Sequence, residues 1–140
     1  MTLLRAGYIE VDGLRLHYLE WGEEVAPPMV LLHDSGDDAR GWERFAEAMS
    51  AEFHVLALDR RDRDSGYALD DHVSDIDALV SQRARDGVLL VGHGEGGRHA
   101  VAYAARNPGK VSALVVVDSG ITAPDTWDEW RRVRCPALVA

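Results

Sequence analysis

The stretch Val88-Leu-Leu-Val-Gly-His-Gly-Glu-Gly-Gly97 contains three consecutive structural signals. Its first residues form a short apolar run, which is typical of a buried strand. Four glycines then mark a sharp turn, and an alternating pattern of small and apolar residues follows from Glu95 to Asn107, where Asn-Pro-Gly ends a predicted helix. A strand that leads through a tight turn into a helix is typical of α/β proteins with parallel sheets.

The rest of the chain fits the same class. Residues 7–21 alternate between apolar and polar around Asp12-Gly13, which predicts a β-hairpin near the N-terminus. Four apolar runs predict further strands, and the segments between them predict helices. The strands are expected at 29–33, 54–59, 113–118 and 136–140, and the helices at 41–51, 70–85, 95–107 and 125–132. We therefore expect one α/β domain over residues 1–140, with a mostly parallel sheet covered by helices on both faces in three layers.

Three segments resemble the α/β-hydrolase family. Gly92-His93-Gly94-Glu95-Gly96 is similar to the nucleophile elbow, Gly-x-Ser-x-Gly, of that family. The loop Asp34-Ser35-Gly36 follows the strand ending at His33, where family members typically have His-Gly, and the loop 60–66 after Asp59 is similar to the family's Asp-x-Arg-Gly loop. The resemblance covers essentially the whole chain and implies an α/β-hydrolase core with an N-terminal hairpin.

The departures from the family pattern concern the reacting groups. Glycine stands at position 94 in place of the serine, and aspartates stand at positions 34 and 62 in place of glycines. By resemblance, the acid and the histidine of a Ser-His-Asp triad follow the serine in chain order, and the sequence ends at Ala140 before them. The segment between Asp118 and Cys135 is also short for the cap of relatives. We therefore expect a truncated hydrolase core without its nucleophile, cap, acid and histidine.

Ligands of open parallel sheets bind beyond the carboxyl ends of the strands. That edge is expected to gather His33, Asp34, Asp59, Asp62, His93, Glu95 and Asp118. His33, Asp34, Asp62 and His93 are candidate ligands of a divalent metal, Zn or Mn, because imidazole and carboxylate groups bind such ions. A metal-bound hydroxide would then replace the missing serine, with Asp34, His93 and Asp62 as the catalytic residues. The predicted function is hydrolysis of a small-molecule carboxyl ester, lactone or phosphotriester.

Each candidate also has a structural interpretation. Asp59 suits a loop hydrogen bond, His33 is a family residue that orders its own loop, and Glu95 complements the N-terminus of its own helix. Asp34 and Asp62 are as compatible with solvated loop positions as with metal ligation. The positions of His54, His72 and His99, at a strand start and on helices, favour a site role less.

Two other functions remain open. Gly92-x-Gly94-x-x-Gly97 matches the dinucleotide-binding fingerprint, with Asp118 at the end of the next strand. Alternatively, the chain is a catalytically inactive hydrolase core that serves as a scaffold or a dimerisation module. Because the run 137–140 would be an uncovered sheet edge, we expect a homodimer through this strand.

Composition limits the partners. The formal net charge of −9 argues against nucleic acid, whose phosphates need a basic face. The single cysteine, Cys135, suits a reducing compartment, and neither a signal peptide nor a membrane-spanning stretch is recognisable. We therefore expect a cytoplasmic protein with no membrane partner. A hydrophobic share of 46% is enough for a buried core.

Overall fold

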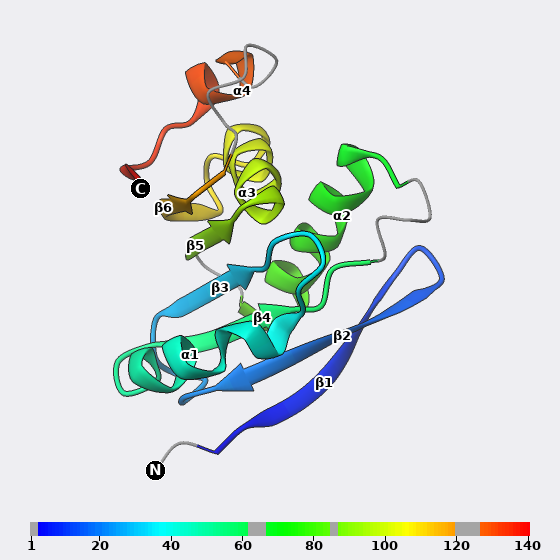
Figure 1. Cartoon of the computed structure of the whole chain (residues 1–140), viewed down its shortest axis with the longest axis vertical. Coiled ribbons are helices and arrows are strands. Elements are labelled where there is room, and N and C mark those ends of the chain that lie inside the picture. The colour runs from blue at the N-terminus through cyan, green and yellow to red at the C-terminus, as the bar shows by residue number, and fades with distance from the viewer. Residues whose placement is uncertain (1–2, 62–66, 85–86, 120–126) are drawn as a thin grey trace.

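The computed structural model describes residues 3–61, 67–84, 87–119 and 127–140. Their strands form a seven-stranded sheet in the order β1-β2-β4-β3-β5-β6-β7, in which β2 runs antiparallel to both of its neighbours, β1 and β4, and the remaining pairs are parallel (Figure 1). The strands are β1 (Arg5–Val11), β2 (Leu14–Trp21), β3 (Pro28–Leu32), β4 (His54–Leu58), β5 (Val88–His93), β6 (Val111–Val117) and β7 (Ala137–Val139). The predicted fold class is confirmed.

The hairpin between β1 and β2 forms at the predicted turn. Asp12 and Gly13 both have positive φ, of 49° and 81°, which is the backbone that a two-residue turn needs to match the twist of its strands. The register pairs Val11 with Leu14 and continues to Arg5 with Glu20.

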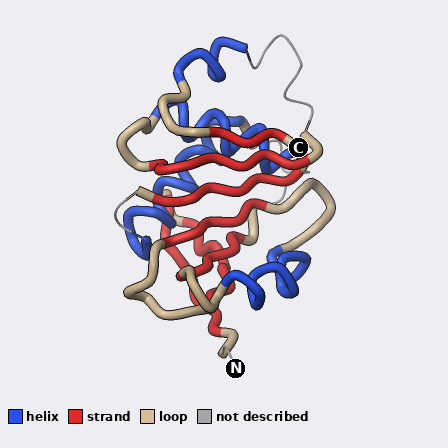
Figure 2. The backbone as a smooth tube through the Cα atoms, turned by 90° about the vertical axis from the view of Figure 1, so that its left-hand side faces the viewer, coloured by secondary structure: helices blue, strands red, loops and turns tan. Residues whose placement is uncertain are grey.

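Helices cover both faces of the sheet. The helical segments are η1 (Ala39–Trp42), α1 (Glu43–Met49), α2 (Leu69–Leu79), the π-helical stretch η3 (Val80–Ala84), α3 (Glu95–Arg106) and α4 (Trp127–Arg132). Helix α1 lies on one face, and α2 and α3 lie on the other, so that the strands run between two helical layers (Figures 1 and 2). None of the described helices is long and apolar enough to cross a membrane.

The buried apolar residues form two clusters, one on each face of the sheet, because the side chains of a strand alternate between its two faces. Along β3, Met29 and Leu31 pack toward α1, whereas Val30 and Leu32 pack toward α2 and α3. All four side chains are buried, because successive residues of a strand point to opposite faces. The strands therefore appear in the sequence as continuous apolar runs, as expected for a sheet that is covered twice.

The structure refines three predicted boundaries. The helix expected at 41–51 begins as a 3-10 turn at Ala39, where the Asp38 side chain accepts a hydrogen bond from the Arg40 N–H. The helix expected at 70–85 is α helical only to Leu79 and continues as η3. Strand β7 is shorter than predicted and leaves Leu138 61% exposed at the sheet edge.

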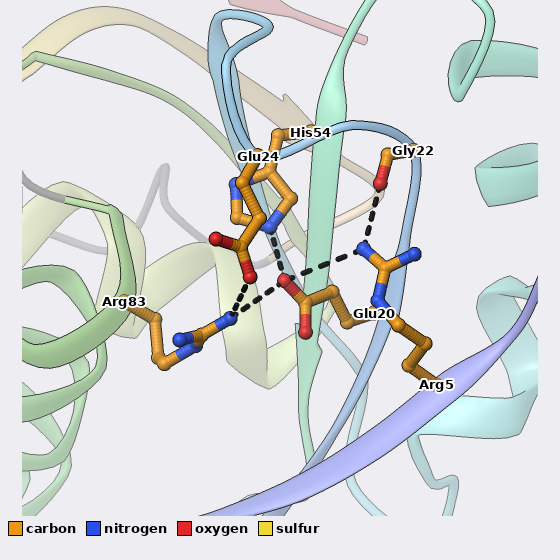
Figure 3. Close-up of polar contacts among 6 residues, drawn as sticks. All are labelled: Arg5, Glu20, Gly22, Glu24, His54 and Arg83. Atoms are coloured by element: carbon orange, nitrogen blue, oxygen red, sulfur yellow. Dashed lines mark hydrogen bonds and ion pairs between the residues drawn. The ribbon is translucent and has the colours of Figure 1, made fainter.

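A buried polar network ties η3 to the sheet at the end opposite the predicted site (Figure 3). The carboxylate of Glu20 on β2 bonds to His54 on β4 and accepts a hydrogen bond of 2.9 Å from Arg83. Arg83 also bonds to Glu24 at 2.8 Å, and Arg5 lies 3.5 Å from Glu20. Because buried polar groups need partners, this network gives His54 a structural role, in line with the lesser site role that its position at a strand start predicts.

Candidate functional site

The turn between β5 and α3 keeps the backbone of a nucleophile elbow. Gly94 has φ +56° and ψ −124°, and its N–H donates to Val117 O at 3.0 Å. Positive φ is unfavourable for residues with a side chain, so the elbow holds a strained conformation that glycine adopts without cost. The turn is also tight, since a Cβ at Gly96 would lie 2.4 Å from Leu32 O.

The carboxylate of Asp34 fills the place of the missing elbow side chain. A Cβ at Gly94 would lie 2.1 Å from both Cγ and Oδ1 of Asp34. Asp34 Oδ1 accepts hydrogen bonds from the backbone N–H of Ser35 at 2.7 Å and of Glu95 at 2.8 Å. The same two kinds of N–H, one after the elbow residue and one from the loop after the third strand, form the oxyanion hole of α/β-hydrolases. Here the hole holds the chain's own carboxylate.

The environment keeps Asp34 ionised. The hydrogen bond from the Glu95 N–H is the largest influence that holds the pKa of the Asp34 carboxyl below its ordinary value, and the charges of His93 and Arg60 act in the same direction. The position at the start of α3 adds to this effect, because the N-terminal end of a helix favours negative charge.

His33 is buried, and both of its ring nitrogens are engaged. Nε2 accepts a hydrogen bond from the Arg60 N–H at 3.1 Å, so that Nδ1 carries the proton and donates to Asp34 O at 2.7 Å. Burial is the main cause that lowers the pKa of His33. This geometry leaves no ring lone pair for a metal ion and matches the structural interpretation, in which His33 orders the loop that carries Asp34.

The other predicted metal ligands are not brought together. The ring of His93 packs edge-on against Trp42, with 6.4 Å between centroids, and lines an apolar cavity of about 530 Å³ on the α1 side. Asp62 lies outside the described residues. Within the described part of the chain, no group of three or more His, Cys, Asp or Glu side chains is placed to hold a metal ion. The metal site thus stays a prediction.

Of the remaining acidic residues of the edge, Asp59 has structural partners for its carboxylate, and Asp118 is held through its backbone. Asp59 accepts from Ala39 N at 2.7 Å and bonds to His17 Nδ1 at 2.6 Å, as the loop interpretation expects. The Asp118 N–H donates to Ala140 O at 2.8 Å, which links the ends of β6 and β7.

Sequence reasoning missed a polar cavity on the α2–α3 side of the elbow. This cavity, of about 350 Å³, is lined in part by Arg60, His72, Arg98 and His99, and we call it the imidazole pocket. Because His72 and His99 come from helices, the sequence pattern favours a site role for them less. The spacing of His99, one helical turn after Glu95, is the signal that could have placed it at the elbow.

The glycines of the dinucleotide fingerprint have packing reasons of their own. A Cβ at Gly92 would lie 2.5 Å from Gly96 O, and one at Gly97 would lie 2.7 Å from Ser119 Oγ. These close approaches between β5, α3 and the end of β6 require glycine at both positions, whether or not a nucleotide binds. Dinucleotide binding through Gly92, Gly94 and Gly97 stays a prediction.

Comparison with known proteins agrees with this geometry. The model of the "Alpha/beta hydrolase family" matches residues 29–140, and the chain belongs to this family. It is 29% identical over 130 residues to N-formylmaleamate deformylase of Pseudomonas putida, with 88% of this chain and 48% of that protein covered. It is 31% identical to human epoxide hydrolase 4, with 79% of this chain and 33% of that protein covered.

Solved structures support the same fold. A membrane phospholipase A superposes with a TM-score of 0.77 and 30% identity, over 84% of this chain and 40% of that one. An epoxide hydrolase from Vigna radiata superposes with a TM-score of 0.75 and 26% identity, over 81% and 40% of the two chains. The chain therefore spans less than half the length of these relatives.

Proposed function

We propose that this chain forms the reacting half of a small-molecule hydrolase in which the Asp34 carboxylate takes the role of the missing serine hydroxyl. One observation carries the proposal: the carboxylate stands where the elbow side chain would begin, with Oδ1 held by two backbone N–H groups. A carboxylate is an established nucleophile for covalent catalysis. The hydrogen bonds to Oδ1 orient Oδ2 as the attacking atom.

The chemistry would proceed in two steps on an electrophilic carbon, such as that of an epoxide. Asp34 Oδ2 forms a bond to the carbon, the ring C–O bond breaks, and the released alkoxide takes a proton from water. The resulting hydroxide adds to Cγ of the ester, and negative charge develops on Oδ1 between the N–H groups of Ser35 and Glu95. Loss of the alkoxide, which takes up the remaining proton, regenerates the carboxylate and releases a diol, so that one water is consumed.

The two N–H groups that bond Oδ1 of Asp34 contribute most to catalysis in the second step. Donors that are already aimed at a developing oxyanion stabilise the transition state without reorganisation, and losing one typically costs about 100-fold or more in rate. The same arrangement suits activated esters, whose attack by Asp34 gives a mixed anhydride that water hydrolyses. Relatives named as epoxide hydrolases, as a deformylase and as an esterase/perhydrolase support a hydrolytic role for the fold.

Isotope transfer tests the proposal. Turnover of an epoxide in water enriched in the heavy oxygen isotope should label the peptide that contains Asp34, as read by mass spectrometry. The first product molecule should carry ordinary oxygen, because that atom comes from Asp34. The Asp34→Asn variant should lose turnover while keeping an acceptor for both N–H groups, and Asp37→Asn in the same loop is the matched control.

The metal-assisted route predicted from the sequence is the second candidate. In that route Asp34, Asp62 and His93 would hold a Zn or Mn ion, which would supply an activated water as the nucleophile. Turnover by this route should stop with a chelator and return with added metal, and the heavy isotope should enter the first product while Asp34 stays unlabelled. Absence of turnover with every substrate and metal would refute both routes and favour an inactive core.

A further inference from the structure

His17 and Asp59 form a pair at the carboxyl edge of the sheet that the proposed hydrolase does not use. His17 lies on β2, and its side chain is on the same face of the sheet as Leu19 and Trp21, the face on which α1 lies. Asp59 directly follows β4, and its N–H donates to His17 O at 2.9 Å. The side chains also meet, with 2.6 Å between His17 Nδ1 and Asp59 Oδ2. The backbone and the side chains thus both fix the imidazole relative to the carboxylate.

The carboxylate of Asp59 is itself held, and this determines the tautomer of His17. Asp59 Oδ1 accepts a hydrogen bond from the Ala39 N–H at 2.7 Å, which leaves Oδ2 for the imidazole. Because a carboxylate can only accept, Nδ1 of His17 carries the proton and Nε2 carries the lone pair. A carboxylate that orients an imidazole in this way also stabilises the imidazolium that forms when Nε2 reacts.

The reactive nitrogen of His17 is open to solvent. The side chain is 34% exposed. None of the described residues bonds to Nε2, and this atom is not among the buried side-chain atoms that lack a partner. In His33, by contrast, both ring nitrogens are engaged. An imidazole whose lone pair faces solvent can attack an electrophilic carbon and form a covalent intermediate.

An exposed aromatic ring stands beside this imidazole. Tyr8 on β1 is the cross-strand partner of His17, and the two ring centroids lie 5.4 Å apart with 60° between the planes. Tyr8 is 56% exposed. Aromatic groups pack on one another in offset or edge-to-face contacts at such distances. The uncovered part of the Tyr8 ring can therefore hold an aromatic leaving group next to Nε2.

We propose that His17 and Asp59 form a second reactive centre, at which Nε2 of His17 attacks the carbonyl carbon of aryl esters. Nε2 forms a bond to this carbon and the C–O bond to the aryl group breaks, which gives an acyl-imidazolium and an aryloxide. Water then adds to the acyl carbon, the C–N bond breaks, and its electron pair returns to Nε2. One proton of the water goes to the aryloxide, so that an acid and a phenol leave and His17 is regenerated.

Asp59 is a positioning residue of this centre, and replacing it by asparagine changes the tautomer of His17. In Asp59→Asn the Ala39 N–H still needs an acceptor and keeps the amide oxygen, so the amide nitrogen faces His17. Nδ1 of His17 must then accept, and the ring proton moves to Nε2. Nε2 loses its lone pair, although the contacts that hold the loop remain.

Hydrolysis of nitrophenyl acetate tests the centre in the Asp34→Asn chain, where the carboxylate route of the proposed function does not contribute. His17→Gln should remove most of the rate above that of the buffer, and Asp59→Asn should lower it several-fold. Glu10→Gln, which removes a carboxylate from the same face of the hairpin, should leave the rate unchanged. Acid quenching during turnover should leave the acyl group on the peptide that contains His17, as read by mass spectrometry.

The outcomes separate this centre from the reaction at Asp34. An unchanged rate in His17→Gln, with the fold checked by circular dichroism, would overturn the centre. A lower rate without an acyl group on His17 would exclude the nucleophilic step. Nitrogen NMR of the unchanged chain keeps the inference testable if His17→Gln does not fold, because a proton on Nε2 instead of Nδ1 would also refute it. None of these results affects the epoxide experiment, which reports on Asp34 alone.

Discussion

The Asp34 carboxylate and the side-chain-free Gly94 are expected to depend on each other for stability. Asp34→Ala removes an ionised acceptor from two N–H groups, at 2.7 and 2.8 Å. Hydrogen bonds to charged groups contribute about 1.5–3 kcal/mol, and partial exposure of this loop places the expected loss at about 1–2 kcal/mol. Gly94→Ser puts a side chain at φ +56°, which costs about 1–3 kcal/mol, and also displaces the carboxylate that a Cβ would meet at 2.1 Å.

The double variant with both changes should be more stable than the sum of the two losses predicts. Once Asp34→Ala has removed the carboxylate, the serine side chain has room, and only the backbone strain remains. We expect a favourable coupling free energy of about 1–2 kcal/mol, within the range found for residues in contact. Urea unfolding of the four proteins, followed by circular dichroism, gives this quantity directly. Losses that add to within about 0.5 kcal/mol would show that the two positions do not share space.

Three further predictions concern regions outside the site. Glu20→Gln should destabilise the fold by about 1–2 kcal/mol, since it removes the charged acceptor shared by the half-buried Arg83 and the buried His54, whereas the exposed Glu52→Gln should change little. Burial raises the pKa of Glu20, but its hydrogen bonds to the surrounding imidazole and guanidinium outweigh burial and hold the pKa below its ordinary value. The stabilisation by Glu20 is therefore complete above the unfolded pKa of about 4.3 and is lost as the pH falls through the pKa of the folded protein. Urea unfolding midpoints measured across acidic pH should show this loss. Tyr103→Phe should cost about 1 kcal/mol by removing the 2.9 Å hydrogen bond to Asp77, and unchanged thermal unfolding would contradict this. The predicted homodimer through β7 should appear in light scattering and be disrupted by Leu138→Lys, and a monodisperse species of 15.4 kDa would refute it.

The sequence predicts most of the fold because its signals are local. The alternation around Asp12-Gly13 and the apolar run before Gly92 each determine a strand from neighbouring residues alone. The sequence does not predict the change from α to π helix after Leu79, nor the contact of Arg83 with Glu20 on β2, which joins residues far apart in the chain.

The site was predictable in position but not in geometry. Asp34 stands out in the sequence because it departs from a family glycine, and it lies at the elbow. Its direction depends on the adjacent His33, which hydrogen bonds with Arg60 at the end of the neighbouring strand hold in place, and such contacts between distant parts of the chain have no local signature. The imidazole pocket escapes sequence reasoning for the same reason, because its rings come from two helices that meet only in the folded chain.

The Asp34 carboxylate occupies the space that a side chain at position 94 would need, and this has a consequence for how the two positions evolve. A serine at position 94 and the aspartate at position 34 compete for one volume, so a lineage that acquires one of them is under pressure to lose the other. Among descendants of a common ancestor, the two positions should change together. Proteins with aspartate at position 34 should have glycine at position 94, and proteins with serine at position 94 should have glycine at position 34. Under the proposed function, a search for hydrolases that inspects only the elbow would overlook members that carry the reacting carboxylate in the adjoining loop.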